Sequence, residues 1–340
     1  MNIPARPWTK KHPPKRILAI RLQAMGDMVI TLPYLQFLKN HLPEGTVLDL
    51  LTREEMESIP RRIRLFNKVY SIGGGRSLKK QMLHALLLLP GLIARRYDAV
   101  IDLQNNGLSR LVRRALRPGA WSAFDRFSCL SAGERTRATI EALGLGPCGL
   151  DSRFITGTDE TELLIAGGWK KDHELLVLNP AGAFETRNWP LDNYLDFTSR
   201  WLAKFPKTQF LIMGTKQLEQ KAGYLKKALG DRLIDLSCRT TPGQAFAILQ
   251  QAILVLSEDS GLMHMSWVSG IPTLAIFGST RSDWSRPLGS HSFLFDSADL
   301  ECGNCMLERC MYGDNHCLTR LSAARVFERA VTLIPDQQKG

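Results

Sequence analysis

The 340-residue sequence contains no long hydrophobic run. Nowhere do about 20 apolar residues follow one another without interruption, which is the length that a membrane-spanning helix requires. The N-terminal stretch is basic and rich in proline, and it has no apolar core followed by a small-residue cleavage site. We therefore expect neither a membrane span nor a secretory signal.

The nearest approach to an apolar segment is residues 82–94, which His84 and Pro90 interrupt. Pairs of basic residues, Lys79-Lys80 and Arg95-Arg96, bracket it. Two interpretations stay open. The segment is either a core helix with solvated ends or an amphipathic surface that rests on an anionic bilayer.

Acidic residues are scarce relative to basic ones: 33 aspartates and glutamates stand against 44 lysines and arginines, a formal net charge of +11. Such an excess suggests an acidic partner, which can be a nucleic acid, an anionic membrane or a phosphorylated substrate, although many basic proteins are simply soluble. The composition, 44% hydrophobic and 23% charged, is that of a globular chain and excludes a disordered or fibrous one.

Cysteines number seven, an odd count that, without a secretory signal, indicates a reducing cytoplasm. Four of them lie within sixteen residues: Cys302, Cys305, Cys310 and Cys317. Four thiolates this close together suit a tetrahedral zinc or iron site, with His316 as a substitute ligand. Reduced free thiols are the alternative, and the reducing compartment makes disulfides the least favoured state.

Strand-like apolar runs alternate with helix-length periodic segments along the whole chain, which predicts an α/β fold with doubly wound sheets. Strands are expected at residues 16–20, 47–51, 68–71, 99–102, 175–179, 209–213, 233–235, 254–257 and 273–277. Helices are expected near residues 27–41, 192–204, 217–229, 242–251 and 261–269.

The segment 151–173 is rich in glycine and has little strand character, so we place a domain junction there. The predicted domains are residues 1–160 and 161–340. Two Rossmann-like domains facing a central cleft would follow, with ligands at the carboxyl ends of the strands.

The apolar run 252–256 is followed by small polar residues and then directly by a helix. Asp259 or Ser260 can cap that helix, leaving backbone N–H groups and the positive end of the helix dipole for a diphosphate. Gly261 permits close approach of a ligand, Asp259 suits sugar hydroxyls, and His264 lies one turn further on. A capped helix with a satisfied histidine is the structural alternative.

A second candidate site follows the strand at residues 16–20, where Gly26 and Asp27 stand at the start of a helix. Asp27 is either a helix cap or a weak, ionised base, because a helix N-terminus favours the charged form of a carboxylate. Such a base is useful where a hydroxyl loses its proton late in bond formation.

A third candidate site follows the strand at residues 175–179. Gly182 and Ala183 keep the backbone accessible, and Arg187 offers a permanent charge with a fork of donors for phosphate. Trp189 precedes a proline that is expected to start the next helix.

The order of these stretches resembles the lipopolysaccharide heptosyltransferases of glycosyltransferase family nine. The matching motifs are Met25-Gly26-Asp27 with Leu32-Pro33, Arg187-Asn188-Trp189-Pro190, and Asp259-Ser260-Gly261-Leu262-Met263-His264. Residues 100–105 also resemble that family's fourth-strand segment. The resemblance covers about residues 16–330.

The resemblance implies a GT-B fold in which domain 1–160 binds the acceptor and domain 161–340 binds an ADP-heptose donor. It implies inverting transfer with no metal ion or other cofactor for catalysis. Asp27 would be the general base, and Gly26 would belong to the acceptor-side loop. The implied donor-binding residues are Gly182, Arg187, Asp259, Ser260, Gly261 and His264.

Two residues depart from the family's pattern. Ala24 stands where many relatives have serine, and Lys216 stands in a loop where some relatives carry acidic residues. The four-cysteine spacing is common near the C-terminus in this family, where it looks structural rather than catalytic.

The expected partners are ADP-heptose, the phosphorylated lipopolysaccharide inner core and the anionic surface of the inner membrane, on its cytoplasmic face. Another nucleotide sugar or a protein acceptor is the alternative within the fold. Nucleic-acid binding is the alternative from another class. It is disfavoured because residues 299–317 hold four acidic residues against one arginine.

Overall fold

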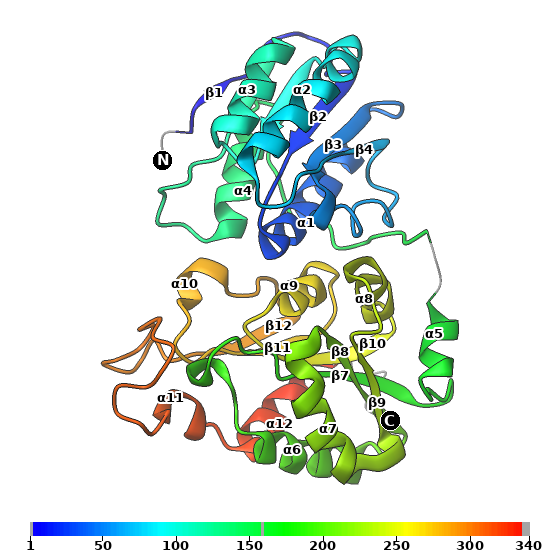
Figure 1. Ribbon diagram of the computed structural model, residues 1–340, viewed down its shortest axis with the longest axis vertical. Coiled ribbons are helices and arrows are strands. Elements are labelled where there is room, and N and C mark those ends of the chain that lie inside the picture. The colour runs from blue at the N-terminus through cyan, green and yellow to red at the C-terminus, as the bar shows by residue number, and fades with distance from the viewer. Residues whose placement is uncertain (1–2, 158–159, 335–340) are drawn as a thin grey trace. The chain divides into compact units, whose positions relative to one another are not determined.

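The computed structural model describes residues 3–157 and 160–334. The chain forms two compact units, Met1–Gly157 and Thr158–Gly340, each with its own six-stranded sheet (Figure 1).

The first unit contains a six-stranded sheet in the order β1-β6-β5-β2-β3-β4. Its strands are β1 (Ala5–Arg6), β2 (Arg16–Ile20), β3 (Val47–Arg53), β4 (Lys68–Ile72), β5 (Ala99–Asp102) and β6 (Ala120–Ala123). Only β1 runs antiparallel among these described strands. The helices are α1 (Met25–His41), α2 (Leu78–Ala94), α3 (Gly107–Leu116) and α4 (Ala132–Glu141).

The second unit contains a parallel sheet in the order β12-β11-β10-β7-β8-β9. Its strands are β7 (Glu174–Asn179), β8 (Thr208–Gly214), β9 (Leu233–Ser237), β10 (Ala252–Glu258), β11 (Thr273–Ile276) and β12 (Ser292–Phe295). Its α-helices are α5 (Thr161–Ala166), α6 (Leu191–Lys204), α7 (Glu219–Leu229), α8 (Pro242–Leu249), α9 (Gly261–Val268), α10 (Ser282–Ser285), α11 (His316–Thr319) and α12 (Ala323–Leu333). Its short 3-10 turns are η2 (Glu185–Arg187), η3 (Lys216–Leu218) and η4 (Gly230–Arg232), and the first unit contains η1 (Glu54–Met56).

The central strands are buried on both faces because helices cover both sides of each sheet, which is why they read as continuous apolar runs. In the second unit, β7, β8 and β10 pack against Tyr194, Phe197 and Trp201 of α6. This rigid support holds the carboxyl ends of β7 and β10, where the candidate donor residues lie.

The α/β prediction is confirmed, and each of the nine predicted strands overlaps an observed one. Three strands were missed: β1, β6 and β12. They are at most four residues long and lie at or next to a sheet edge, so they lack the long apolar run that marks a central strand. Among the described residues, no helix combines the length and the apolar character that crossing a membrane requires.

Candidate active site

The carboxyl ends of β7 and β10 meet because the two strands pair in parallel, with Asn179 opposite Ser257. The Asn179 amide donates hydrogen bonds to the hydroxyls of Ser257 and Ser260, each at 2.7 Å. Ser260 is the N-cap of α9, and its hydroxyl accepts the Met263 N–H at 3.2 Å. Of the two predicted caps, the structure therefore uses Ser260, and Asp259 is left for another partner.

That partner is Arg187. Its Nη1 lies 3.2 Å from Oδ2 of Asp259, and each side chain is 15% exposed. The Thr280 hydroxyl donates to the same carboxylate oxygen at 3.0 Å, and the Arg187 guanidinium lies 5.1 Å from the centre of the Phe184 ring. The pair places a fixed positive charge beside the N-terminal end of α9, where the helix dipole also favours an anion.

Glu258, directly before Asp259, is buried and was given no role by the sequence. Its carboxylate accepts the N–H groups of Gly182 at 2.6 Å and Trp189 at 2.7 Å, and the Tyr194 hydroxyl at 3.3 Å. Burial raises the pKa of Glu258 to about 7, although these donors and Lys221 oppose the shift. The carboxylate thus ties both ends of loop 180–190, which carries Arg187, to the end of β10.

Lys221 of α7 holds the same loop from the other side. Its Nζ donates to the Pro180 carbonyl at 2.6 Å and to Oδ1 of Asn188. Burial lowers the pKa of Lys221, and the charge of Glu258 opposes that shift. The sequence offered one signal for Glu258, because a carboxylate at the end of an apolar strand is unusual. It offered none for Lys221, because lysines are common on helices at the surface.

The two glycines of the predicted donor set differ in what requires them. A Cβ on Gly182 would lie 2.3 Å from the Arg187 carbonyl oxygen, so glycine is needed there for the loop to pack on itself. A Cβ on Gly261 would meet no described atom within 4 Å. Only at Gly261 does the open space leave room for a ligand to approach the backbone.

His264 is buried, and its Nδ1 accepts the Trp267 indole N–H at 3.2 Å. It therefore supports α9 from within the unit. The structure brings together Gly182, Arg187, Asp259, Ser260, Gly261 and His264 around the ends of β7 and β10.

In the first unit, Asp27 lies in the first turn of α1, and Ala24 is the N-cap residue. Oδ2 of Asp27 accepts the Ala24 N–H at 3.4 Å and lies 2.5 Å from Nη2 of Arg21. The carboxylate thus accepts a backbone N–H at the start of α1, while the Asp27 side chain remains 39% exposed. The capping interpretation and the reactive one are compatible.

Arg21, which the sequence did not single out, is buried beneath Asp27. It donates to the Leu103 carbonyl and lies 5.0 Å from the centre of the Phe124 ring. Burial lowers the pKa of Arg21, and the charge of Asp27 opposes that shift. The buried guanidinium, which contacts Asp27 directly, holds its carboxylate in position.

The loop that leads to Gly26 is held from β5. Oε1 of Gln104 accepts the N–H groups of Leu22 at 2.9 Å and Gln23 at 3.0 Å. This gives a physical role to the segment 100–105, in which the sequence showed only a resemblance.

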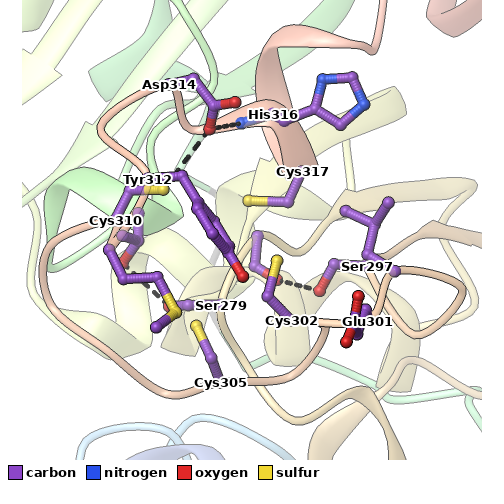
Figure 2. A pocket seen from close by; sticks show the side chains of 14 residues that line it. Ser279, Ser297, Glu301, Cys302, Cys305, Cys310, Tyr312, Asp314, His316 and Cys317 are labelled. Carbon is purple, nitrogen blue, oxygen red and sulfur yellow. Dashed lines mark hydrogen bonds between the residues drawn. The ribbon is translucent and has the colours of Figure 1, made fainter.

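The four clustered cysteines line one cavity of about 260 Å³ in the second unit (Figure 2). The cavity is also lined by Glu301, Tyr312, Asp314 and His316. All four thiols are free, and burial together with the neighbouring thiols raises the pKa of Cys317. Within residues 3–157 and 160–334, however, no three His, Cys, Asp or Glu side chains are grouped closely enough to hold a metal ion.

The cysteine segment packs directly against the loop that carries Arg187. Thr186 donates to the Leu307 carbonyl at 2.5 Å, and Sδ of Met306 lies 3.9 Å from Nη2 of Arg187. Whatever fixes the cysteine segment therefore also fixes one side of the arginine.

Two parallel-sheet units, with candidate residues at the carboxyl ends of their strands, define the GT-B class of glycosyltransferase folds. Escherichia coli ADP-heptose lipopolysaccharide heptosyltransferase II has this fold. It is 17% identical in sequence, covers 94% of this chain and 98% of its own, and superposes with a TM-score of 0.71.

Residues 154–316 match the model of glycosyltransferase family 9 (heptosyltransferase). Lipooligosaccharide heptosyltransferase 2 of Campylobacter jejuni is 25% identical over 183 residues, 52% of this chain and 55% of that protein. Lipopolysaccharide heptosyltransferase 1 of Pseudomonas aeruginosa is 23% identical, over 94% of this chain and 99% of that protein. The match thus spans about half of the Campylobacter protein and nearly all of the Pseudomonas one. The resemblance to glycosyltransferase family 9 is confirmed.

Proposed function

We propose that the protein transfers a heptose from ADP-heptose to the inner core of lipopolysaccharide, with inversion at the anomeric carbon. The observation that carries this proposal is the Arg187–Asp259 pair beside the capped N-terminus of α9. It combines a cationic anchor for a diphosphate with a carboxylate that accepts hydrogen bonds from sugar hydroxyls. The relatives named above are heptosyltransferases, which supports the choice of sugar.

In the proposed reaction, the acceptor hydroxyl oxygen attacks the anomeric carbon as the bond from that carbon to the ADP oxygen breaks. The hydroxyl proton passes to Asp27, and the bonding electrons leave with ADP. Arg187 and the N–H groups of α9 stabilise the charge that builds on the diphosphate, so the proposed mechanism needs no catalytic metal ion. The Asp259 carboxylate by itself would repel the donor phosphates. The positive charge of Arg187, its ion-pair partner, offsets this repulsion.

The donor specificity is tested with purified protein and heptose-free lipopolysaccharide, comparing ADP-heptose with UDP- and GDP-sugars. We expect product with ADP-heptose only. Product with a UDP- or GDP-sugar alone would overturn the donor assignment and favour the alternative of another nucleotide sugar. Transfer to a protein, with none to lipopolysaccharide, would overturn the acceptor.

We also propose that Cys302, Cys305, Cys310 and Cys317 bind a structural zinc or iron ion. They line one cavity, which supports the proposal, but their thiols would have to move closer together to form a tetrahedral site. The ion would fix the segment that contacts Thr186 and Arg187, and it would take no part in the chemistry.

Protein purified without chelator should contain about one metal ion per chain by elemental mass spectrometry. The double variant Cys305→Ser/Cys310→Ser should contain less than about a tenth of that and show a raised KM for the donor, because the Arg187 loop loses a support. Cys129→Ser, at an exposed cysteine of the first unit, is the matched control. A wild-type protein without metal, or a double variant that keeps it, would rule the site out.

A further inference from the structure

Helix α2 presents an apolar surface to solvent. Five large side chains on it are 49–71% exposed: Leu78, Leu83, Leu86, Leu87 and Ile93. Leu83 is followed three and four residues later by Leu86 and Leu87, and exposed Pro90 and then Ile93 follow at further steps of three, so these residues lie along one face of the helix. An exposed helix face normally carries polar residues.

The opposite face of α2 is apolar as well and already has its partner. Ala85 and Leu92 are buried, and Met82, Leu88 and Leu89 pack against the core of the first unit. The exposed leucines are therefore not needed to pack this helix against the core of the first unit. A contiguous exposed apolar face of this kind marks an interaction surface.

Basic residues lie at both ends of this surface and on the neighbouring helix. Lys79 and Lys80 are exposed at its start, and Arg96 is exposed just beyond its end. Residues 81–94 contain no charged residue. The neighbouring helix α3 lies beside α2 (Figure 1). It exposes Arg110, Leu111 and Arg114, and Arg117 is exposed directly after its end.

The charge of the whole chain is divided in the same way. Unit 1–157 holds 25 lysines and arginines against 12 aspartates and glutamates, a net charge of +13, whereas the remaining residues hold 19 against 21, a net charge of −2. The excess that the composition shows thus belongs entirely to the unit that carries α2. The four-cysteine segment lies in the other unit, which removes support for a basic metal knuckle that binds nucleic acid.

These observations favour one occupant. A second copy of this chain docked on the same face would bring its own lysines and arginines against those of the first, and like charges oppose such a pairing. An anionic phospholipid bilayer satisfies both features, because its interface takes up leucine side chains and its headgroups attract flanking lysines and arginines.

We propose that the outward face of α2, flanked by the basic residues at its ends and on α3, docks the protein on an anionic phospholipid membrane. The docking deepens the proposed function, because it would bring the protein to a lipid-borne acceptor. Vesicle binding itself requires no transfer activity, so it can be measured separately.

The test is co-sedimentation with phosphatidylcholine vesicles that contain or lack phosphatidylglycerol. The wild type should bind the anionic vesicles at least tenfold more strongly, and added salt should weaken that binding. The double variant Leu83→Glu/Leu87→Glu should lose at least tenfold in affinity. Ile165→Glu, at an exposed apolar residue of the second unit, is the matched control and should bind as the wild type does.

The surface leucines contribute little to folding, so the double variant should keep transferring sugar to a deacylated core oligosaccharide. Loss of vesicle binding with retention of that transfer supports the proposal. Wild-type binding of the double variant to vesicles would overturn it, and so would self-association without lipid that the double variant abolishes. If the wild type transfers no sugar at all, the proposed function fails while the vesicle result still decides the docking surface.

Discussion

Asp27→Ala is expected to abolish turnover while leaving ADP binding nearly intact. In the proposed reaction Asp27 takes the acceptor proton, whereas the donor residues lie in the other unit. General bases contribute about 10²–10⁴-fold to rates, and a loss of that size in kcat is expected. Steady-state ADP release measures the rate, and calorimetric titration measures ADP affinity.

Asp27→Ala also removes the partner of a buried guanidinium, so part of its effect can come from the fold. Asp27→Asn separates the two causes. Its amide oxygen can still accept a hydrogen bond from the N–H of Ala24 or from the guanidinium of Arg21, but it cannot take up a proton from a hydroxyl. It should therefore lose less in Tm than Asp27→Ala does and show the same fall in kcat.

The matched control for this pair of variants is Asp196→Ala. Asp196 is also ion-paired to an arginine, with Nε of Arg200 at 2.9 Å, and its side chain is 49% exposed. It lies on α6 and belongs to neither candidate site, so its rate should be unchanged. A normal rate in Asp27→Asn would remove Asp27 from the mechanism.

Glu258→Gln is expected to raise the KM for the donor about tenfold with a smaller change in kcat. The carboxylate accepts N–H groups on both of its oxygens, from Gly182 and Trp189. An amide has only one acceptor oxygen, so its NH₂ group would face one of these donors and leave it unsatisfied. The loop carrying Arg187 would loosen, and the donor phosphates would lose a fixed charge.

The same variant should change how stability depends on pH. The ordinary pKa of Glu258 is 4.5, and in the folded protein it is about 7. Between these values the folded chain holds a proton that the unfolded chain has released, so the stability contributed by this group falls as the pH rises. Glu258→Gln should lack this decline, which denaturant titrations at pH 5 and pH 8 would reveal.

Glu174→Gln is the matched control for Glu258. Burial also raises the pKa of Glu174, but this residue lies at the opposite end of the sheet, where β7 begins. Its substitution should leave the donor KM unchanged. An unchanged KM in Glu258→Gln would show that the loop is held without the carboxylate.

The fold was predictable where burial and sequence pattern coincide. β2 and β5 occupy the predicted residues because a parallel strand covered on both faces must be apolar throughout. β1, β6 and β12 were missed because they are two to four residues long and lie at or next to a sheet edge, where a strand need not be apolar on both faces. The sequence left two interpretations of residues 82–94, a core helix or a surface that binds a membrane, because both faces of this helix are apolar. Only the exposed fractions of the side chains in the structure show which face is buried and which meets solvent.

The sequence determined which residue types end each strand, because only polar or small residues can occupy positions where a buried strand opens to solvent. It therefore located Asp27, Arg187 and Asp259. Tertiary structure decided how they are held, because Arg187 and Asp259 are 72 residues apart in the chain. Glu258 and Lys221 likewise reach the loop that carries Arg187 from segments that no local spacing connects to it. The sequence by itself thus identifies the candidate reactive side chains, and the packing of the sheets and their loops fixes the positions of these side chains.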